Sequence, residues 1–201
     1  MHIRTSDGVL LEARWDSRPN PQRVVVLCHP NPAQAGSMAA PLMRLLASHL
    51  AGMGWAVLRF NFRGVGESTG VSGQGEREVD DVAGAVTAAR TAHPDLPLGI
   101  AGWSFGAMVA LRWLARDRVP LPYVGIAMPV GEMALPGVDG LPVAPRRFIV
   151  GARDRQLSVE ALRTYVEAIG AELVVLPGSD HFFLLRDERL ARVVAEGLMG
   201  G

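Results

Sequence analysis

The pentapeptide Gly102-Trp103-Ser104-Phe105-Gly106 constrains this chain more than any other segment, because it lies between two apolar runs of different kinds. Residues 97–101 before it indicate a strand, and residues 107–111 after it indicate the start of a helix. A G-x-S-x-G pattern at such a junction predicts a nucleophile elbow, in which the glycines let other backbone pass close to an exposed serine. The alternative is a glycine-rich turn with an incidental serine, and the strand-to-helix context favours the elbow.

An activated serine requires a base and an acid that orients the base, and two later strand ends supply both. Residues 147–150 form a short apolar run that leads to Asp154, and residues 172–176 form the next run, which leads to His181. Parallel sheets collect their functional groups at the carboxyl ends of the strands, and Ser, Asp, His is the order of the triad in α/β-hydrolases. We therefore expect Ser104 to be the nucleophile, His181 the base and Asp154 the orienting acid.

The other four histidines fit the role of base less well. His2 lies at the terminus, His49 lies in a helical pattern and His93 precedes a proline in a loop, which indicates solvated or packing residues. His29 follows a strand, but it precedes the nucleophile in the chain. We expect His29 to anchor its loop by hydrogen bonds.

Two alternatives exist for the acid. Asp180 is next to His181 in the sequence, but adjacent side chains rarely face each other as an Asp–His hydrogen bond requires. Asp154 lies between Arg153 and Arg155, so a surface ion pair is the other interpretation of this residue. Its position just past the end of a strand favours the triad role.

The oxyanion of such a reaction requires N–H donors. Residues 23–28 indicate a buried strand that ends at His29-Pro30-Asn31-Pro32, and in this fold the loop after that strand gives one donor. Proline has no N–H, which points to Asn31. We expect the N–H of Phe105, the residue after the nucleophile, to be the second donor, beside the positive end of the helix dipole.

Five segments together resemble those of small, cap-less α/β-hydrolases of the dienelactone-hydrolase and carboxylesterase-like group. In the order of that family they are residues 29–32, 61–68, 102–106, 151–154 and 180–183. The resemblance implies an α/β-hydrolase fold, with a mostly parallel central sheet covered by helices on both faces and no cap domain. Dienelactone hydrolases have Cys in the elbow, so Ser104 favours ordinary esters. Asn61 stands where related hydrolases often have Asp.

Length and hydrophobic patterning agree with a single α/β-hydrolase domain over residues 1–201. Further strands are expected over residues 9–15, 56–62 and 123–128. Helix caps are expected at Ser158 and Gly170. Helical spacing predicts four inward faces: Leu42, Leu45, Leu46 and Met53; Val79, Val82, Val86 and Ala89; Leu162, Tyr165, Val166 and Ile169; and Leu190, Val193 and Val194.

Residues 129–145 connect two strands at the place where many relatives carry a helical cap. This link has 17 residues with three Gly and four Pro, which predicts an open site without a helical lid. The apolar residues Met128, Val130, Met133 and Leu135 either line an acyl or alcohol pocket or hold the link on the core. Arg63 either binds a substrate carboxylate or braces the loop after its strand, and the second role is favoured.

Charge and cysteine content limit partners and location. The 20 basic and 20 acidic residues balance, so we expect neither nucleic-acid nor anionic-membrane binding. The single Cys28 lies in an apolar strand and the amino terminus lacks the apolar core of a signal peptide, which predicts a cytoplasmic protein. No residues have metal-ligand spacing, so we expect neither a metal nor another cofactor.

These features predict a serine hydrolase that cleaves small, short-acyl carboxylic esters through an acyl-enzyme. A thioesterase or a perhydrolase would use the same triad. A catalytically silent scaffold that binds a ligand or a protein partner is the alternative from another class, because a fold alone does not determine function. The sequence predicts no oligomeric state.

Overall fold

The structure is a computed structural model that describes residues 1–200, in which eight strands form one sheet of order β1-β2-β4-β3-β5-β6-β7-β8. β1 and β2 are antiparallel to their neighbours, and β3 to β8 are parallel. This confirms the mostly parallel sheet that the sequence predicts. The strands are β1 (His2–Arg4), β2 (Leu10–Asp16), β3 (Arg23–Cys28), β4 (Trp55–Phe60), β5 (Leu98–Trp103), β6 (Tyr123–Ile126), β7 (Arg146–Gly151) and β8 (Glu172–Leu176).

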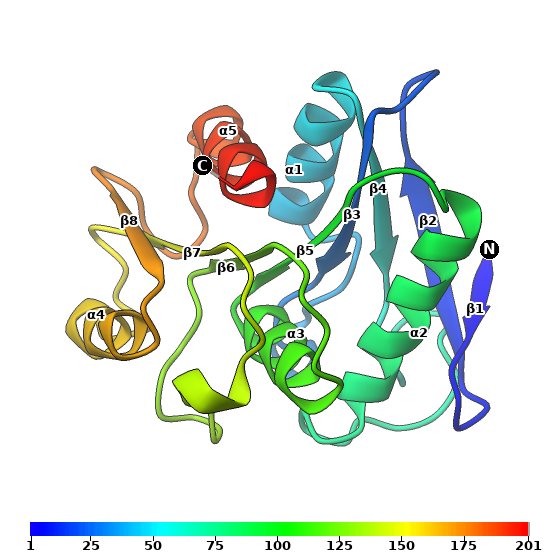
Figure 1. The fold of residues 1–201 in the computed structure, drawn as a ribbon, viewed down its shortest axis with the longest axis horizontal. Coiled ribbons are helices and arrows are strands. Elements are labelled where there is room, and N and C mark those ends of the chain that lie inside the picture. Colours follow the sequence, from blue (N-terminus) through cyan, green and yellow to red (C-terminus); the bar gives the residue numbers. More distant parts are fainter. Residues whose placement is uncertain (201) are drawn as a thin grey trace.

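Helices cover both faces of the sheet (Figure 1). One face carries α1 (Pro41–Gly52) and α5 (Asp187–Met199); the other carries α2 (Glu78–Ala92), α3 (Phe105–Arg116) and α4 (Val159–Ala168). Strand β3 shows why its sequence is apolar throughout: Val24 and Val26 belong to the core under α2 and α3, whereas Val25 and Leu27 belong to the core under α1 and α5. None of the helices in residues 1–200 is long and apolar enough to cross a membrane.

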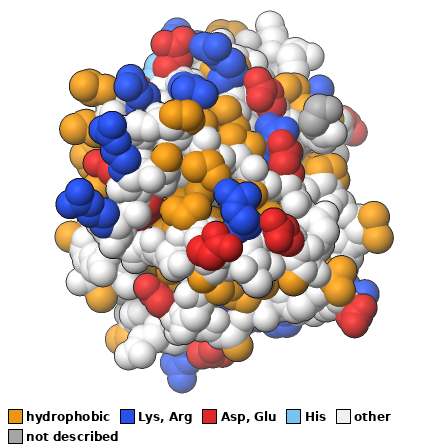
Figure 2. Space-filling model, turned by 90° about the vertical axis from the view of Figure 1, so that its left-hand side faces the viewer, with side chains coloured by type: hydrophobic (Ala, Val, Ile, Leu, Met, Phe, Trp, Pro, Cys, Tyr) orange, Lys and Arg blue, Asp and Glu red, His pale blue; other side chains and the backbone are white. Residues whose placement is uncertain are grey.

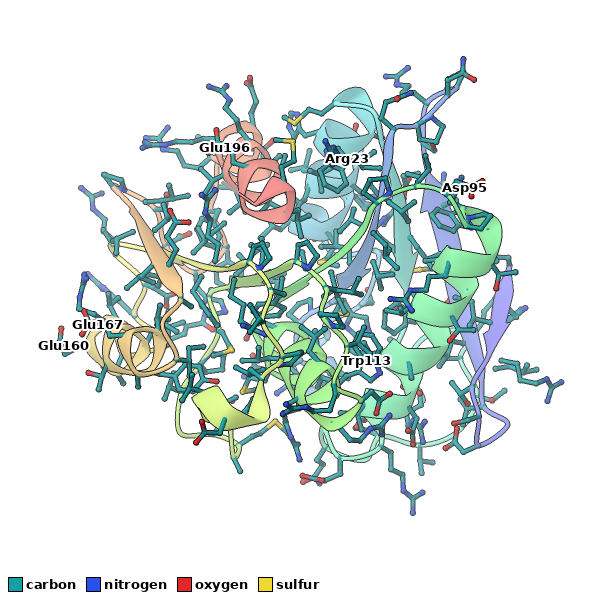
Figure 3. All side chains as sticks on the ribbon, in the orientation of Figure 1. Arg23, Asp95, Trp113, Glu160, Glu167 and Glu196 are labelled. Atoms are coloured by element: carbon teal, nitrogen blue, oxygen red, sulfur yellow. The ribbon has the colours of Figure 1, made fainter. Side chains whose placement is uncertain are left out.

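The ends of α4 follow the expected capping chemistry. The Ser158 hydroxyl accepts a hydrogen bond from the Ala161 N–H at 3.1 Å, and Gly170 follows the helix with a φ of 65°. Figure 3 shows the charged side chains of Glu160 and Glu167 on the side of α4 that faces away from the sheet. The helix therefore has the apolar and polar faces that its sequence predicts.

The inward face of α1 differs from the prediction. Leu42 and Leu46 are buried as expected, but Leu45 is 46% exposed and Met53, which follows the helix, is 43% exposed. The helix rotates so that its core-facing residues are Leu42, Met43, Leu46, Ala47 and Leu50. Spacing alone includes Leu45 because it is apolar and next to that stripe.

Strand β8 forms the edge of the sheet opposite β1, and its Leu173, Val174 and Val175 are only partly buried. Figure 2 faces this end of the molecule and shows hydrophobic side chains between acidic and basic ones. Neither sign of charge covers this face alone, in keeping with the balanced composition.

The link between β6 and β7 contains one short 3-10 helix, Val138–Gly140, and residues 129–145 form no α-helix. Proline cannot continue a helix, and the four prolines of the link interrupt any longer helical run. The prediction that residues 129–145 form no helical cap is confirmed.

Candidate active site

The turn between β5 and α3 is a strained elbow around Ser104. Its φ of 53° and ψ of −118° lie in a region that residues with a side chain rarely occupy. A Cβ on Gly102 would lie 2.5 Å from the Ala107 nitrogen, and a Cβ on Gly106 would collide with the backbone carbonyls at the end of β3. Both glycines are therefore required for the close approach of the backbone that presents Ser104.

His181 and Asp154 form a hydrogen-bonded pair across the ends of β8 and β7. His181 Nδ1 lies 2.8 Å from Asp154 Oδ2, and the Asp154 side chain is 0% exposed. The second carboxylate oxygen of Asp154 accepts the Gln156 N–H at 2.8 Å. On the other side, the Trp103 indole donates to the backbone oxygen of His181 at 3.2 Å. These contacts fix both the acid and the imidazole.

Asp180 does not take the place of Asp154. Its side chain accepts the Phe182 N–H at 3.0 Å, which shapes the loop after β8. Neither Arg153 nor Arg155 forms an ion pair with Asp154 or any other part of residues 1–200, so the surface-pair interpretation of Asp154 is wrong.

Ser104 and His181 face a shared space that we call the central hollow, of about 450 Å³. Within residues 1–200 the Ser104 hydroxyl has no hydrogen bond to His181, and such contacts are often long before substrate binds. Two further hollows join this space. The central hollow is lined by Asn31, Gln34, Ser104, Phe105, Pro129, Glu132, Gln156 and His181.

Each of the two adjoining hollows shares lining residues with the central hollow. The Met133 arm, of about 570 Å³, is lined by Asn31, Pro32, Ala33, Ser72, Gln74, Phe105, Met108, Glu132 and Met133. The Phe182 arm, of about 340 Å³, is lined by Pro30, Asn31, Gln34, Ala35, Gly36, Ala40, Pro41, Trp103, Ser104, Gln156, His181 and Phe182. Of the two arms, the Phe182 arm is lined by His181 and the Met133 arm is not.

Asn31 and Phe105, the expected oxyanion donors, both line the central hollow beside Ser104. Neither backbone N–H has an acceptor among the described residues 1–200. The Asn31 side chain is used differently, because its oxygen accepts the Ala33 N–H at 2.9 Å and starts the short 3-10 helix Pro32–Gln34. The Asn31 carbonyl accepts the N–H groups of Gln34 and Gly36, so the loop leaves only the Asn31 N–H available.

His29 is fully buried and uses both ring nitrogens within the fold. Nδ1 lies 2.7 Å from the Pro30 carbonyl, and Nε2 accepts the Phe62 N–H at 3.0 Å. Burial lowers the pKa of His29 to about 4, so the ring is neutral at pH 7. These bonds tie the loop after β3 to the end of β4, as the sequence analysis expects.

Arg63 is also committed to the fold. Its buried guanidinium donates to Asp81 at 2.7 and 2.9 Å and to Asp7 at 2.8 Å. Its backbone N–H donates to Asp81 as well. With these donors occupied, Arg63 braces the loop after β4 instead of binding a substrate carboxylate.

The four candidate pocket residues lie in different parts of the structure. Met133 lines the arm named after it, whereas Met128 is 0% exposed and its sulfur lies 3.7 Å from the Tyr123 hydroxyl. Val130 packs against the core, and Leu135 lines a different hollow on the surface of α2 and α3. Met128 and Val130 thus take the second of the two expected roles, because the chain turns back into the core directly after β6. The expected pocket role is corrected for these two residues and for Leu135, whose hollow does not include Ser104.

The sequence analysis did not identify several residues that line the central hollow. Gln34 ends the short 3-10 helix Pro32–Gln34, and Glu132 and Gln156 lie in loops. All three are exposed polar residues that line the central hollow, and no pattern in the sequence marks such positions. Glu78 is fully buried and accepts bonds from the Ser72 hydroxyl and the N–H groups of Gly73 and Gly75. An acidic residue at the start of an otherwise apolar helix face is the signal that identifies such a loop anchor.

Comparison with known proteins places this geometry in a family. Residues 19–128, more than half of the chain, match the family model described as serine aminopeptidase, S33. The chain belongs to this family. As a member of the serine aminopeptidase S33 family it is a hydrolase with the α/β-hydrolase fold.

Solved structures of α/β hydrolases are similar to this S33-family chain over almost its whole length. XC6422 from Xanthomonas campestris, an α/β serine hydrolase without a lid, is 27% identical with a TM-score of 0.82, over 99% of this chain and 92% of that one. ATU1826 from Agrobacterium tumefaciens, a putative α/β hydrolase, is 25% identical with a TM-score of 0.85, over 99% and 94%.

A protein from Rickettsia prowazekii (strain Madrid E), RP471, is similar as well. It is 28% identical over 94% of this chain and 84% of its own length, and it is described as uncharacterized. The similarities therefore support a lid-less α/β serine hydrolase.

Proposed function

We propose that this hydrolase cleaves carboxylic esters with Ser104 as nucleophile, His181 as base and Asp154 as the acid that orients His181. The observation that carries the proposal is the 2.8 Å contact between His181 Nδ1 and the enclosed carboxylate of Asp154, at the edge of the hollow that Ser104 also lines. An acid bonded to Nδ1 keeps the proton on that nitrogen and leaves Nε2 as the base.

The reaction has two steps. In the first, His181 Nε2 takes the proton of the Ser104 hydroxyl as its oxygen attacks the ester carbonyl, and the N–H groups of Asn31 and Phe105 stabilise the oxyanion. His181 then gives the proton to the departing alcohol oxygen. In the second step, water deprotonated by His181 attacks the acyl-enzyme, and Ser104 leaves with its proton restored.

The short, irregular link at residues 129–145 supports small, short-acyl esters as substrates, because it provides no lid to enclose a long chain. The proposal also places the activity in a single domain in the cytoplasm. The lone buried Cys28 agrees with a reducing compartment.

Hydrolysis of p-nitrophenyl acetate and butyrate tests the proposal. Wild-type protein should turn over both esters, and Ser104→Ala should lower turnover by up to ~10⁶-fold while circular dichroism stays unchanged. Ser17→Ala, which removes an exposed hydroxyl from the loop after β2, is the matched control and should keep full activity. Activity of Ser104→Ala equal to that of wild type would refute the proposal.

A further inference from the structure

The two arginines beside Asp154 have side chains without a partner in residues 1–200, although they lie next to His181. Arg153, Arg155, Gln156, Asp180, His181 and Phe182 line a hollow of about 370 Å³, which we call the arginine hollow. Arg153 is held in place through its backbone, because its N–H donates to the Ser179 carbonyl at 2.8 Å. The buried arginines Arg59, Arg63 and Arg147, by contrast, all bind carboxylates of the fold.

The arginine hollow continues the Phe182 arm. Gln156, His181 and Phe182 line both spaces, so a substrate group that leaves Ser104 through that arm extends toward Arg153 and Arg155. The Phe182 ring also lies 5.9 Å from the Trp103 ring, centre to centre, and the two form an aromatic wall along this route.

The chemistry of acyl transfer decides which part of an ester takes this route. His181 must give a proton to the departing oxygen, so the alcohol part of the ester lies on the His181 side of Ser104. The Met133 arm lacks His181 and is lined by Phe105, Met108 and Met133, which suits the acyl part. The alcohol part therefore occupies the Phe182 arm and reaches the arginine hollow.

The charges on the two sides of the site differ in sign. Glu132 is exposed and lines both the Met133 arm and the central hollow, so an anionic acyl group meets a negative charge there. The residues that line the arginine hollow include two arginines and one acidic residue, Asp180, so its formal charge is positive. Guanidinium groups form paired hydrogen bonds with carboxylate and phosphate oxygens.

We infer that the natural ester carries an anionic group, a carboxylate or a phosphate, on its alcohol part, and that Arg153 and Arg155 bind this group. This inference rests on the proposed function and narrows its substrate class. Arg153 and Arg155 thus make the enzyme prefer esters with an anionic alcohol part, because they bind the leaving group.

The test compares the acetyl ester of 4-hydroxybenzoate with the same ester after methylation of its carboxylate. The readout is the ratio of kcat/KM for the anionic ester to kcat/KM for the neutral ester. The two esters differ in intrinsic reactivity, but this difference is the same for wild type and variant, so it drops out when their ratios are compared. Two exposed ion pairs of ordinary strength change this ratio by a factor of about 2 to 30. The acetyl ester of 4-hydroxyphenyl phosphate, tested in parallel, separates phosphate from carboxylate recognition.

In the double variant Arg153→Gln/Arg155→Gln the ratio should fall by that factor, and in Arg153→Lys/Arg155→Lys it should fall less, because the charge is kept. The control Arg18→Gln/Arg90→Gln removes two exposed arginines outside the arginine hollow and should leave the ratio unchanged. Raising the salt concentration from about 10 to about 500 mM should lower the wild-type ratio through screening.

Each outcome decides the matter. The anion site would be overturned if the Gln variant had the same ratio as wild type, and the wild-type ratio did not depend on salt. If the neutral ester were still hydrolysed, the esterase proposal would stand. If wild-type protein hydrolysed none of the esters, the esterase proposal would be wrong and the anion site would fall with it. A fall in the ratio in the control variant equal to that in the Gln variant would show long-range charge instead of a site.

Discussion

His181 and Asp154 meet at the ends of two neighbouring parallel strands, with Nδ1 and Oδ2 2.8 Å apart and the carboxylate enclosed. In the mechanism that we propose, the enclosed carboxylate stabilises the imidazolium that forms during proton transfer, and its bond to Nδ1 leaves Nε2 for Ser104. The carboxylate of Asp180, although next to His181 in the sequence, is directed to the Phe182 backbone.

Asp154→Asn should therefore lower kcat for p-nitrophenyl acetate by ~10⁴-fold with little change in KM, since the tautomer of His181 changes while the hollows do not. Asp180→Asn is the matched control and should cost far less. Steady-state kinetics of both variants measure the difference. The opposite ranking of the two variants would assign the acid to Asp180.

Acyl-chain selectivity follows from the missing lid. Full burial of one methylene stabilises binding by about 0.8 kcal/mol, but residues 129–145 form no helical lid that would enclose the far end of a long acyl chain. The kcat/KM for p-nitrophenyl esters should thus level off or fall beyond a chain of several carbons, without a jump when the substrate becomes an emulsion. A steady rise through long chains would mean that another segment forms a deep covered pocket.

His29 should make the stability of the protein depend on pH. Its folded-state pKa of about 4 lies below the value of about 6.5 for an exposed imidazole, so the unfolded chain binds a proton first as the pH falls. The stability that the neutral ring contributes is complete above about pH 6.5 and is lost between about pH 6.5 and 4. The difference of about 2.5 pH units corresponds to about 3 kcal/mol.

Urea unfolding at a series of pH values measures this dependence. His29→Gln, which keeps a donor and an acceptor but does not titrate, should show a shallower loss of stability in this interval than wild type. His2→Gln removes an exposed imidazole and should behave as wild type. Parallel curves for wild type and His29→Gln would contradict a buried, neutral His29.

The side-chain amide of Asn61 makes two contacts that an Asp, the residue expected here from the resemblance, could not both make. The buried amide donates to Glu12 Oε2 at 2.7 Å and accepts the Met38 N–H at 2.8 Å. Asn61→Asp should lower the free energy of unfolding by about 1–3 kcal/mol, because a carboxylate cannot donate to Glu12 and repels it.

Chemical denaturation compares Asn61→Asp with Asn20→Asp, the same substitution at an exposed turn, which should have little effect. Adding Glu12→Gln to Asn61→Asp supplies a new donor and should recover part of the loss. An unchanged unfolding midpoint for Asn61→Asp would show that the contact with Glu12 contributes nothing.

Sequence reasoning was most successful where local pattern and chemistry coincide. The Gly102 to Gly106 turn, the strands that lead to Asp154 and His181, and the cap at Ser158 are all encoded by neighbouring residues, so the parallel sheet and its functional edge could be predicted. These features depend on backbone sterics and on periodicity, which a single sequence displays directly.

The walls of the site depend on contacts that no local pattern displays. Met128 follows a strand that ends at Ile126, and the turn at Ala127, with a φ of 45°, sends the methionine into the core. Glu132 and Gln156 reach the site from loops whose paths are set by distant packing. The residues that line the pocket could therefore be predicted less well than the placement of Ser104, His181 and Asp154 at the ends of strands.

Labelling with a fluorophosphonate, followed by peptide mapping, tests the central claim most directly, because the probe reacts with an activated serine without requiring the right ester. Cleavage after Arg90 and Arg112 gives a peptide, residues 91–112, in which Ser104 is the only serine. We predict a single adduct in this peptide, no adduct in Ser104→Ala, and much slower labelling of Asp154→Asn. An adduct on another residue, or labelling of Ser104→Ala at the wild-type rate, would contradict the account.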